Sequence, residues 1–380
     1  MGNPRYIQTD QQSFYGDYLY DQIIPENHFL RKLNDLVDWT YYTKKLTKLY
    51  KGEGLSGRPA YDPALLLRSL LISYLYNLSE RQTEVYLNES LPAKWFVGLA
   101  IDQKAPDHST LSVYRERIRR RGKLKVFEEM LREIVETARK RGVQFGAIQI
   151  IDSVHSEANV NTDKDEPDKP EDPDARWGVK HSYKVQTPEG KEEVRKQYFH
   201  GYKSHMSMNA ENQLITGLEV SSGNAWDGKH FSSLVEMDME QGLPVETYAA
   251  DRGYDDGNNH YYLAYKGLHS AILLKDNRLK KKDGNKTLEE ETNISKEDGN
   301  KEVWQDMVRT AEYQQGKRER YKIERKFGEA KLRHGLGRCR YIGLEKYGVQ
   351  AYLTAIVLNL KRMVKLISGV GFNCPSYSRG

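Results

Sequence analysis

The chain has 380 residues, a charged fraction of 30% and a formal net charge of +5, with 59 Lys and Arg against 54 Asp and Glu. It contains no apolar run long enough to span a bilayer and no apolar signal core at its start, so we expect a cytoplasmic protein. The only two cysteines, Cys339 and Cys374, exclude a disulfide framework or a structural zinc site.

Helical patterns dominate the first third of the chain. Residues 1–24 are polar and aromatic without a clear period, so we expect an extended N-terminal arm. Apolar residues at helical spacing predict one helix from Asn27 to about Leu49, and several capped helices follow. Residues 25–122 therefore indicate an all-α DNA-binding domain, and residues 123–145 a connecting helix. A purely structural helical cap is the alternative interpretation.

Two basic tracts indicate contact with nucleic acid at defined faces. The first contains Arg115, Arg119 and Lys123, and the second runs from Lys317 to Arg333. Local cationic tracts on a nearly balanced chain are typical of phosphate contact rather than of a general coating. For either tract alone, a solvated helix surface is the alternative interpretation.

At residue 146 the pattern changes to strands alternating with helices. The predicted order is βββαβαβ followed by two long helices, at about 312–334 and 344–368. This order favours an α/β, RNase H-like domain over residues 146–370, with a mixed five-stranded sheet and flanking helices.

Two polar segments interrupt this predicted domain. Residues 162–193 and 276–303 are hydrophilic and are expected to form loops, and residues 371–380 a C-terminal tail. No P-loop or dinucleotide fingerprint is present, so nothing indicates nucleotide use.

Three separated acids are candidates for a metal site. Asp152 and Asp251 each end an apolar strand-like run, and Glu324 lies four residues after Arg320 and seven before Lys331, on one helix face. Mg²⁺ prefers hard oxygen ligands, and a pair of such ions brackets a reacting phosphate in phosphodiester chemistry. Considered singly, each aspartate is more often a cap or a turn residue.

Blocks spread over nearly the whole chain resemble the DDE transposases of bacterial insertion sequences, most closely their InsH-like subgroup. They comprise the stretch from Asp62 to Gln82, Ala93–Leu99, Pro106–Ser112, Asp172–Trp177, His200–His205, Asn224–Asp227 and Asp251–Tyr254. Their combination is specific, whereas each short block alone is a weak signal.

The resemblance implies that Asp152, Asp251 and Glu324 form a catalytic triad that binds two Mg²⁺ ions, for which Mn²⁺ is a substitute. It also implies that the enzyme binds double-stranded DNA at the terminal inverted repeats of its own element. It would cleave the ends, join the freed 3′-hydroxyls to target DNA, and act as a homodimer in a synaptic complex.

The helix signature of the family is Tyr-x2-Arg-x3-Glu-x6-Lys, and this chain departs from it at one position. Arg320, Glu324 and Lys331 fit, but Lys317 occupies the tyrosine position, where it contacts phosphate but cannot stack on a base. Tyr313, one turn earlier on the same face, is a candidate substitute.

Further candidates remain open. Lys203 and His205 alternate on one strand face and either approach DNA or pack across strands. Asn224 and Asp227 either position the site or form a turn and a cap. A nuclease of the same fold without strand transfer, and a catalytically idle DNA-binding derivative, are the rival functions.

Overall fold

The computed structural model describes residues 6–7, 14–51, 59–162, 170–186, 192–279 and 302–372. The chain forms two compact units, of which unit 1 combines Met1–Val143 with Glu329–Gly380 and unit 2 is Gln144–Gly328. In the sequence, the pattern changes from helices to strands at residue 146. The contacts group residues 329–370 with the N-terminal helices, however, whereas the sequence pattern attaches them to the α/β region.

Unit 1 is helical. Its helices are α1 (Phe14–Ile23), α2 (Phe29–Leu36), α3 (Trp39–Thr47), α4 (Pro63–Leu75), α5 (Glu80–Glu89), α6 (Leu91–Val97), α7 (His108–Gly122), α8 (Lys125–Lys140) and α15 (Leu344–Ser368). Helix α15 packs against α8, α4 and α2, and most of its residues from Tyr347 to Val364 are buried. None of the helices in the described ranges combines the length and hydropathy needed to cross a bilayer.

Two expectations for this region are wrong. Part of the expected extended arm is a helix, α1. The single helix expected from Asn27 to Leu49 is two helices, because Val37 is extended and the Asp38 side chain accepts hydrogen bonds from the Thr40 and Tyr41 amides at the start of α3.

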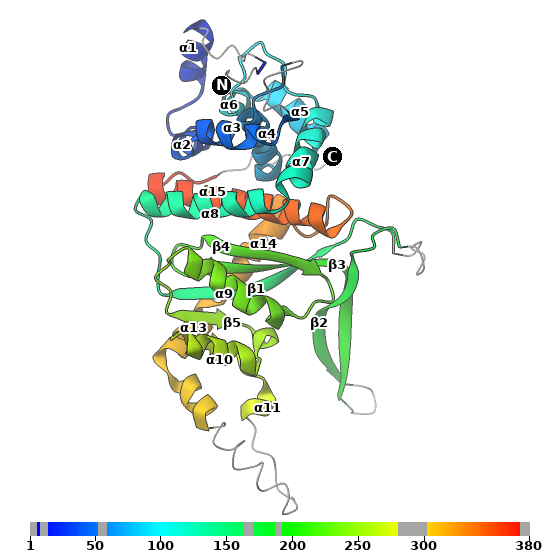
Figure 1. Cartoon of the computed structure of the whole chain (residues 1–380), viewed down its shortest axis with the longest axis vertical. Helices are drawn as coiled ribbons and strands as arrows, with labels where there is room; N and C mark the ends of the chain where they lie inside the picture. Colours follow the sequence, from blue (N-terminus) through cyan, green and yellow to red (C-terminus); the bar gives the residue numbers. More distant parts are fainter. Residues whose placement is uncertain are drawn as a thin grey trace, which may run out of the picture. The chain divides into compact units, whose positions relative to one another are not determined.

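Unit 2 is built on a mixed sheet. Its strands are β1 (Ile148–Glu157), β2 (Arg176–Gln186), β3 (Glu192–Asn209), β4 (Ile215–Ser222), β5 (Thr247–Ala250) and β6 (His269–Ile272). The order is β2-β3-β1-β5-β6, with β4 pairing β3 (Figure 1). Strands β1 to β4 pair antiparallel, and β1, β5 and β6 pair parallel. This is the RNase H-like arrangement expected from the order of elements, enlarged from five strands to six by β2.

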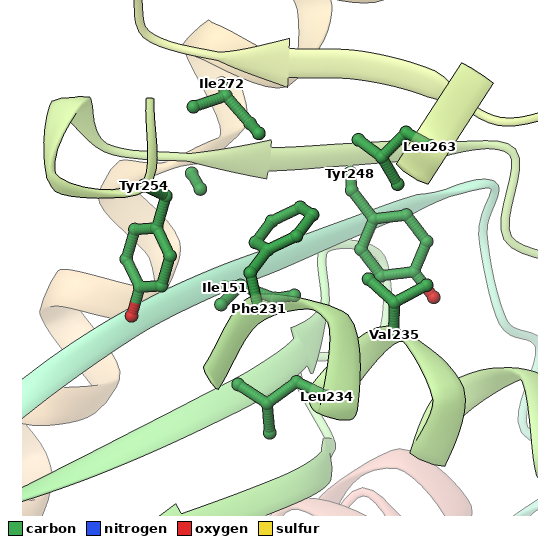
Figure 2. Packing of buried hydrophobic residues seen from close by; sticks show 9 residues of the cluster. Ile151, Phe231, Leu234, Val235, Tyr248, Tyr254, Leu263 and Ile272 are labelled. Atoms are coloured by element: carbon green, nitrogen blue, oxygen red, sulfur yellow. The ribbon is translucent and has the colours of Figure 1, made fainter. Parts of the chain in front are cut away.

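Helices cover both faces of this sheet. On one face, α9 (Phe231–Glu240) and α10 (Gly257–Tyr265) pack their apolar side chains against β1, β5 and β6. Figure 2 shows Phe231 and Leu263 in this cluster with Tyr248. On the other face, α13 (Ala311–Glu319) places Tyr313 against Ala249 and Ala271. The alternation of Tyr248 and Ala249 between the two clusters follows from the two-residue period of a strand.

The polar segments differ from expectation where the structure describes them. Residues 176–186 form β2 rather than a loop, and β3 begins at Glu192. Of the expected loop at 276–303, α11 (Asp276–Leu279) is described, but residues 280–301 lie outside the described ranges, as do residues 373–380 of the expected tail. The helix expected at 312–334 is divided at Arg320 into α13 and α14 (Tyr321–His334).

Candidate catalytic site

Parallel pairing of β1 with β5 brings Asp152 and Asp251 close together. Only Asp251 follows the end of its strand; the expectation that Asp152 also ends one is wrong, because β1 continues past it to Glu157. The register pairs Ile151 of β1 with Ala250, the last residue of β5, and an aspartate follows each of these two residues in the chain. Burial raises the pKa of Asp152 to about 7, and the neighbouring charge of Asp251 adds to this effect. Burial also raises the pKa of Asp251. Two carboxyl groups thus share an environment that disfavours their own negative charge.

Backbone amides hold one oxygen of each aspartate. The Asp152 Oδ1 atom accepts a hydrogen bond from the Ser153 amide at 2.8 Å. Asp251 caps the 3-10 turn η3 (Arg252–Tyr254), and its Oδ1 accepts a hydrogen bond from the Gly253 amide at 2.8 Å. These bonds restrict the orientation of both carboxylates.

Asp227, at the start of the 3-10 turn η2 (Asp227–His230), lies near the pair. A Cβ atom placed on Gly253 would lie 2.9 Å from Asp251 Oδ1 and 3.6 Å from Asp227 Oδ2, so these two oxygens are no further apart than the sum of those distances. The Asp227 charge contributes to raising the pKa of both Asp152 and Asp251. From the sequence, Asp227 is interpreted either as a residue that positions the site or as a cap. The Asn224–Asp227 block, which carries part of the resemblance, is the signal for the first interpretation.

Lys203 lies beside this additional acid. Its Nζ atom is 2.8 Å from Asp227 Oδ1 and donates a hydrogen bond to the Ala225 carbonyl oxygen at 2.9 Å. The structure therefore gives Lys203 an acidic partner within the protein. Its expected contact with DNA remains a prediction.

Arg320 links the third acid to the aspartates. Its Nη2 atom lies 3.8 Å from Glu324 Oε1, and its charge opposes the rise in the pKa of both Asp152 and Asp251. The Arg320 Nε atom is buried and has no hydrogen-bond partner among the described residues. The Glu324 side chain is 62% exposed, so it lies at the solvent side of this group.

The three acids do not form a closed set of ligands in this structure. Among the described residues, the ligand atoms that gather within 4.8 Å of one another belong to Glu84, Asp107 and His108 of unit 1. That group has a structural role, because Glu84 Oε2 accepts hydrogen bonds from both the amide and the Nδ1 atom of His108 at the start of α7.

The carboxylate groups of Asp152 and Asp251 nevertheless fit a hard divalent cation. Asp152 and Asp251 supply carboxylate oxygens, the ligands that Mg²⁺ prefers, and their raised pKa values show that their charge is poorly compensated within the protein. A cation bound there would remove that repulsion. The exposed Glu324 carboxylate would have to move toward the pair to complete the coordination.

A buried histidine lies behind Lys203. The rings of His205 and His230 stack at 3.9 Å between centroids, and His230 Nδ1 lies 2.6 Å from Glu219 Oε2. Burial, with the charges of His230 and Lys203, lowers the pKa of His205 to about 2, so its imidazole is neutral. The interpretation of His205 as a packing residue fits this position.

The cations expected on the α13–α14 region occupy varied environments. Lys317 is exposed on α13 and Lys331 is half-buried on α14. Tyr313 is buried against the sheet, so it does not replace the missing tyrosine of the helix signature on the exposed face.

The cations expected on α7 are partly engaged within unit 1. Arg115 forms an ion pair with Glu80 at 2.5 Å, and Arg119 pairs with Glu116 and Glu345. Lys123 is exposed at the end of α7. Contact of these three residues with DNA remains a prediction.

Two family models match the chain. A family model described as "Transposase DDE domain" matches residues 144–360, more than half of the chain, and one described as "Transposase domain (DUF772)" matches residues 18–117. The chain belongs to the DDE transposase family. It is therefore a DNA transposase, an enzyme that catalyses DNA cleavage and strand transfer, and its family generally uses divalent metal ions.

Two solved structures resemble this transposase distantly. One is a piggyBac transposase synaptic complex with hairpin DNA, which is 10% identical with a TM-score of 0.27, over 99% of this chain and 90% of that chain. The other is a Mos1 transposase paired-end complex with the left transposon end, which is 9% identical with a TM-score of 0.19, over 72% of this chain and 79% of that chain.

Proposed function

We propose that this transposase cleaves DNA with Asp152, Asp251 and Glu324 as ligands of two Mg²⁺ ions. The observation that carries the proposal is that Asp152 and Asp251 directly follow the paired residues Ile151 and Ala250 of two parallel strands, and that both pKa values are raised. Two half-buried carboxylates close to one another repel when both are ionised, and a bound cation removes that cost. Mg²⁺ bound there would activate the attacking oxygen and stabilise the leaving oxygen.

The protein groups around the acids have separate tasks in this proposal. The Ser153 and Gly253 amides orient the two aspartates, and Lys203 offsets the charge of Asp227. Arg320, whose Nη2 atom lies 3.8 Å from Glu324 Oε1, supplies positive charge beside the three acids. Glu324, four residues further along, supplies the third carboxylate from α14.

The proposed substrate is the terminal inverted repeat of the transposase's own insertion sequence, within the InsH-like subgroup. The freed 3′-hydroxyl ends are joined to target DNA. Joining two ends requires that both be held together, so we propose a homodimer on double-stranded DNA, acting in the cytoplasm at the nucleoid. Sedimentation of the protein with terminal duplex tests the dimer, and a complex of one chain with one duplex would contradict it.

A strand-transfer assay with a pre-cleaved end tests the reaction. The transposase is expected to join the 3′-hydroxyl of the duplex to a circular target in Mg²⁺, and Asp152→Asn to yield no joined product. Asp306→Asn, an exposed aspartate outside the site, is the matched control. Cleavage of the duplex without any joined product would support a nuclease instead.

A further inference from the structure

Strand β2 and the first half of β3 form a two-stranded arm beyond the main sheet. The register of β3 with β1 ends at Gly201 and with β4 at Tyr202, and the last backbone hydrogen bond on this side joins the Ala158 amide to the His200 carbonyl oxygen at 2.8 Å. Before His200, the residues of β3 have register partners only on β2 (Figure 1). A two-stranded ribbon is marginally stable by itself in water. The arm therefore requires stabilising contacts beyond the pairing of its own two strands.

The root of the arm is anchored by close backbone contacts. A Cβ atom at Gly178 would lie 2.2 Å from the Gly223 carbonyl oxygen, and one at Gly223 would lie 2.4 Å from the Arg176 carbonyl oxygen. The Gly223 amide also donates a hydrogen bond to the Gly201 carbonyl oxygen at 2.8 Å. Glycine at these positions permits the approach that holds the arm to the loop after β4.

One face of the arm is apolar, aromatic and exposed. The cross-strand pairs Trp177–His200 and Val179–Tyr198 share this face, because alternate residues of a strand point the same way. Trp177 is 57% exposed and Tyr198 55%, whereas Phe199 on the opposite face is buried. Large exposed apolar side chains gathered in this way mark an interaction surface.

The charge of the arm indicates which partner this surface fits. Over 176–186 and 192–200 the sequence has five Lys and Arg (Arg176, Lys180, Lys184, Arg195, Lys196) and two acids, both on β3 (Glu192, Glu193). Arg195 lies 3.6 Å from Glu193, and Lys180 Nζ lies 3.8 Å from Glu157 of β1, so two of these five cations have an acidic neighbour within the protein. A cationic ribbon that carries exposed rings complements a groove of duplex DNA, where phosphates flank base edges and the methyl groups of thymine.

The arm is the continuation of the part of β3 that pairs with β1 at Asp152. Asp152 pairs with Met206, and from there β3 runs back through Gly201 to Tyr198. At about 3.4 Å per residue, the root of the arm lies roughly 17 Å and Tyr198 roughly 27 Å from the Asp152 pair along the strand. In a duplex these lengths correspond to about five to eight base pairs.

We propose that the outward face of this arm, around Trp177 and Tyr198, binds the DNA duplex about five to eight base pairs from the cleaved phosphate. A two-stranded ribbon has the width that the major groove admits. The rings pack against the DNA while the arm's cations neutralise phosphates. The inference rests on the proposed function, because it takes the position of the cleaved phosphate from Asp152 and Asp251.

Hydroxyl-radical footprinting of the full-length protein tests the proposal. The probe is a synthetic duplex of roughly 40 base pairs, about four helical turns, copied from DNA that flanks the reading frame. The variant Trp177→Ser/Tyr198→Ser is expected to bind it about 10- to 100-fold more weakly, since the burial of each large apolar ring contributes roughly a tenfold factor or more. It should also lose protection five to eight base pairs from the cleavage position.

The matched control is Tyr261→Ser/Tyr265→Ser on α10, whose rings are 73% and 75% exposed in the same unit. This variant should keep both affinity and footprint. A second variant that leaves the rings in place, Lys196→Gln, should reduce the slope of log affinity against log salt by about one. Circular dichroism verifies that each variant is folded.

Unchanged affinity and footprint in the ring variant would overturn the proposal. So would a loss of self-association, measured by sedimentation, with DNA affinity intact, since the face would then bind a second copy of the chain. The catalytic proposal fails separately: Asp152→Asn should keep the complete footprint and lose cleavage. If it still cleaves, the assignment of the acids is wrong, whereas loss of the arm's protection in the ring variant still establishes DNA contact by the arm.

Discussion

The carboxyl group of Asp152 is held in an environment that favours its neutral form. Its pKa rises from 3.8 to about 7 through burial and through the charge of Asp251. An acid whose pKa is higher in the folded state keeps its proton while the unfolded chain loses its own. Stability without metal therefore falls as the pH rises from about 4 to about 7.

Asp152→Asn should stabilise the metal-free protein at pH 8. Removing the ionised carboxylate relieves a cost on the order of 2 to 4 kcal/mol, which corresponds to a Tm increase of roughly 5 to 10 °C. Calorimetry at pH 5 and pH 8, with chelator present, measures the difference between variant and wild type. The difference should be larger at pH 8, and Asp306→Asn should show none. Equal differences at both pH values would contradict the assigned environment.

Asp227 is expected to matter through the acids beside it. Asp227→Asn leaves Lys203 without its acidic partner and changes the field at Asp152 and Asp251. Because groups that surround metal ligands typically contribute 10- to 100-fold to metal affinity or activity, we expect Mg²⁺-dependent cleavage to fall by about that factor. Titration of cleavage rate against Mg²⁺ concentration provides the measurement, and an unchanged curve would exclude Asp227 from the site.

At the scale of elements, the close packing of α13 on the sheet fixes the position of Arg320, which separates α13 from α14. Gly316 faces β5 and β6, and a Cβ atom there would lie 2.5 Å from the Ala271 Cβ and 3.3 Å from the Ala249 Cβ. Gly328 on α14 has no atom within 4 Å of the corresponding position. Substitution of these two helical glycines therefore compares a closely packed position with an open one.

Gly316→Ala should destabilise the protein by about 1 to 3 kcal/mol, because overpacking forces backbone shifts. Gly328→Ala should instead stabilise it by about 0.4 to 1 kcal/mol, since it restricts the unfolded chain. Urea unfolding monitored by circular dichroism measures both. Equal effects of the two substitutions would show that α13 does not pack closely on β5 and β6.

The sequence predicts the elements whose residues carry a strong period. Asp152 and Asp251 each follow a short apolar run, so the two strands that carry them are predictable, and so is α15 with its bounds. The continuation of β1 past Asp152 to Glu157 is not, because the residues from Ser153 to Glu157 are mostly polar. Strand β2 is not, because most of its described side chains face solvent and its apolar alternation is weak. The division at Arg320 has no proline or glycine at the break itself, and Asp227 is brought to the site only by tertiary structure.

At the scale of the whole molecule, unit 1 is assembled from both ends of the chain. The buried helix α15 packs on α8, α4 and α2, and Arg340 donates hydrogen bonds to Leu78 and Asn77 after α4. No single continuous segment therefore contains the core of this unit.

Residues 1–143 alone should not unfold cooperatively on heating, because the apolar surface that packs against α15 would be exposed to water. Joining residues 329–372 to them by a flexible linker should restore a cooperative transition. Thermal circular dichroism of the two proteins provides the comparison. A sharp transition for residues 1–143 alone would show that the N-terminal helices form an independent domain.

The most direct test of the proposed metal site replaces a carboxylate ligand by a thiolate. Asp152→Cys should be inactive in Mg²⁺, which binds oxygen, and should regain DNA cleavage in Mn²⁺, which accepts sulfur more readily. Asp152→Ala, which has no ligand atom, should stay inactive in both metals. Cleavage by Asp152→Cys in Mg²⁺ at the wild-type rate, or equal recovery of Asp152→Ala in Mn²⁺, would contradict the assignment of Asp152 as a metal ligand.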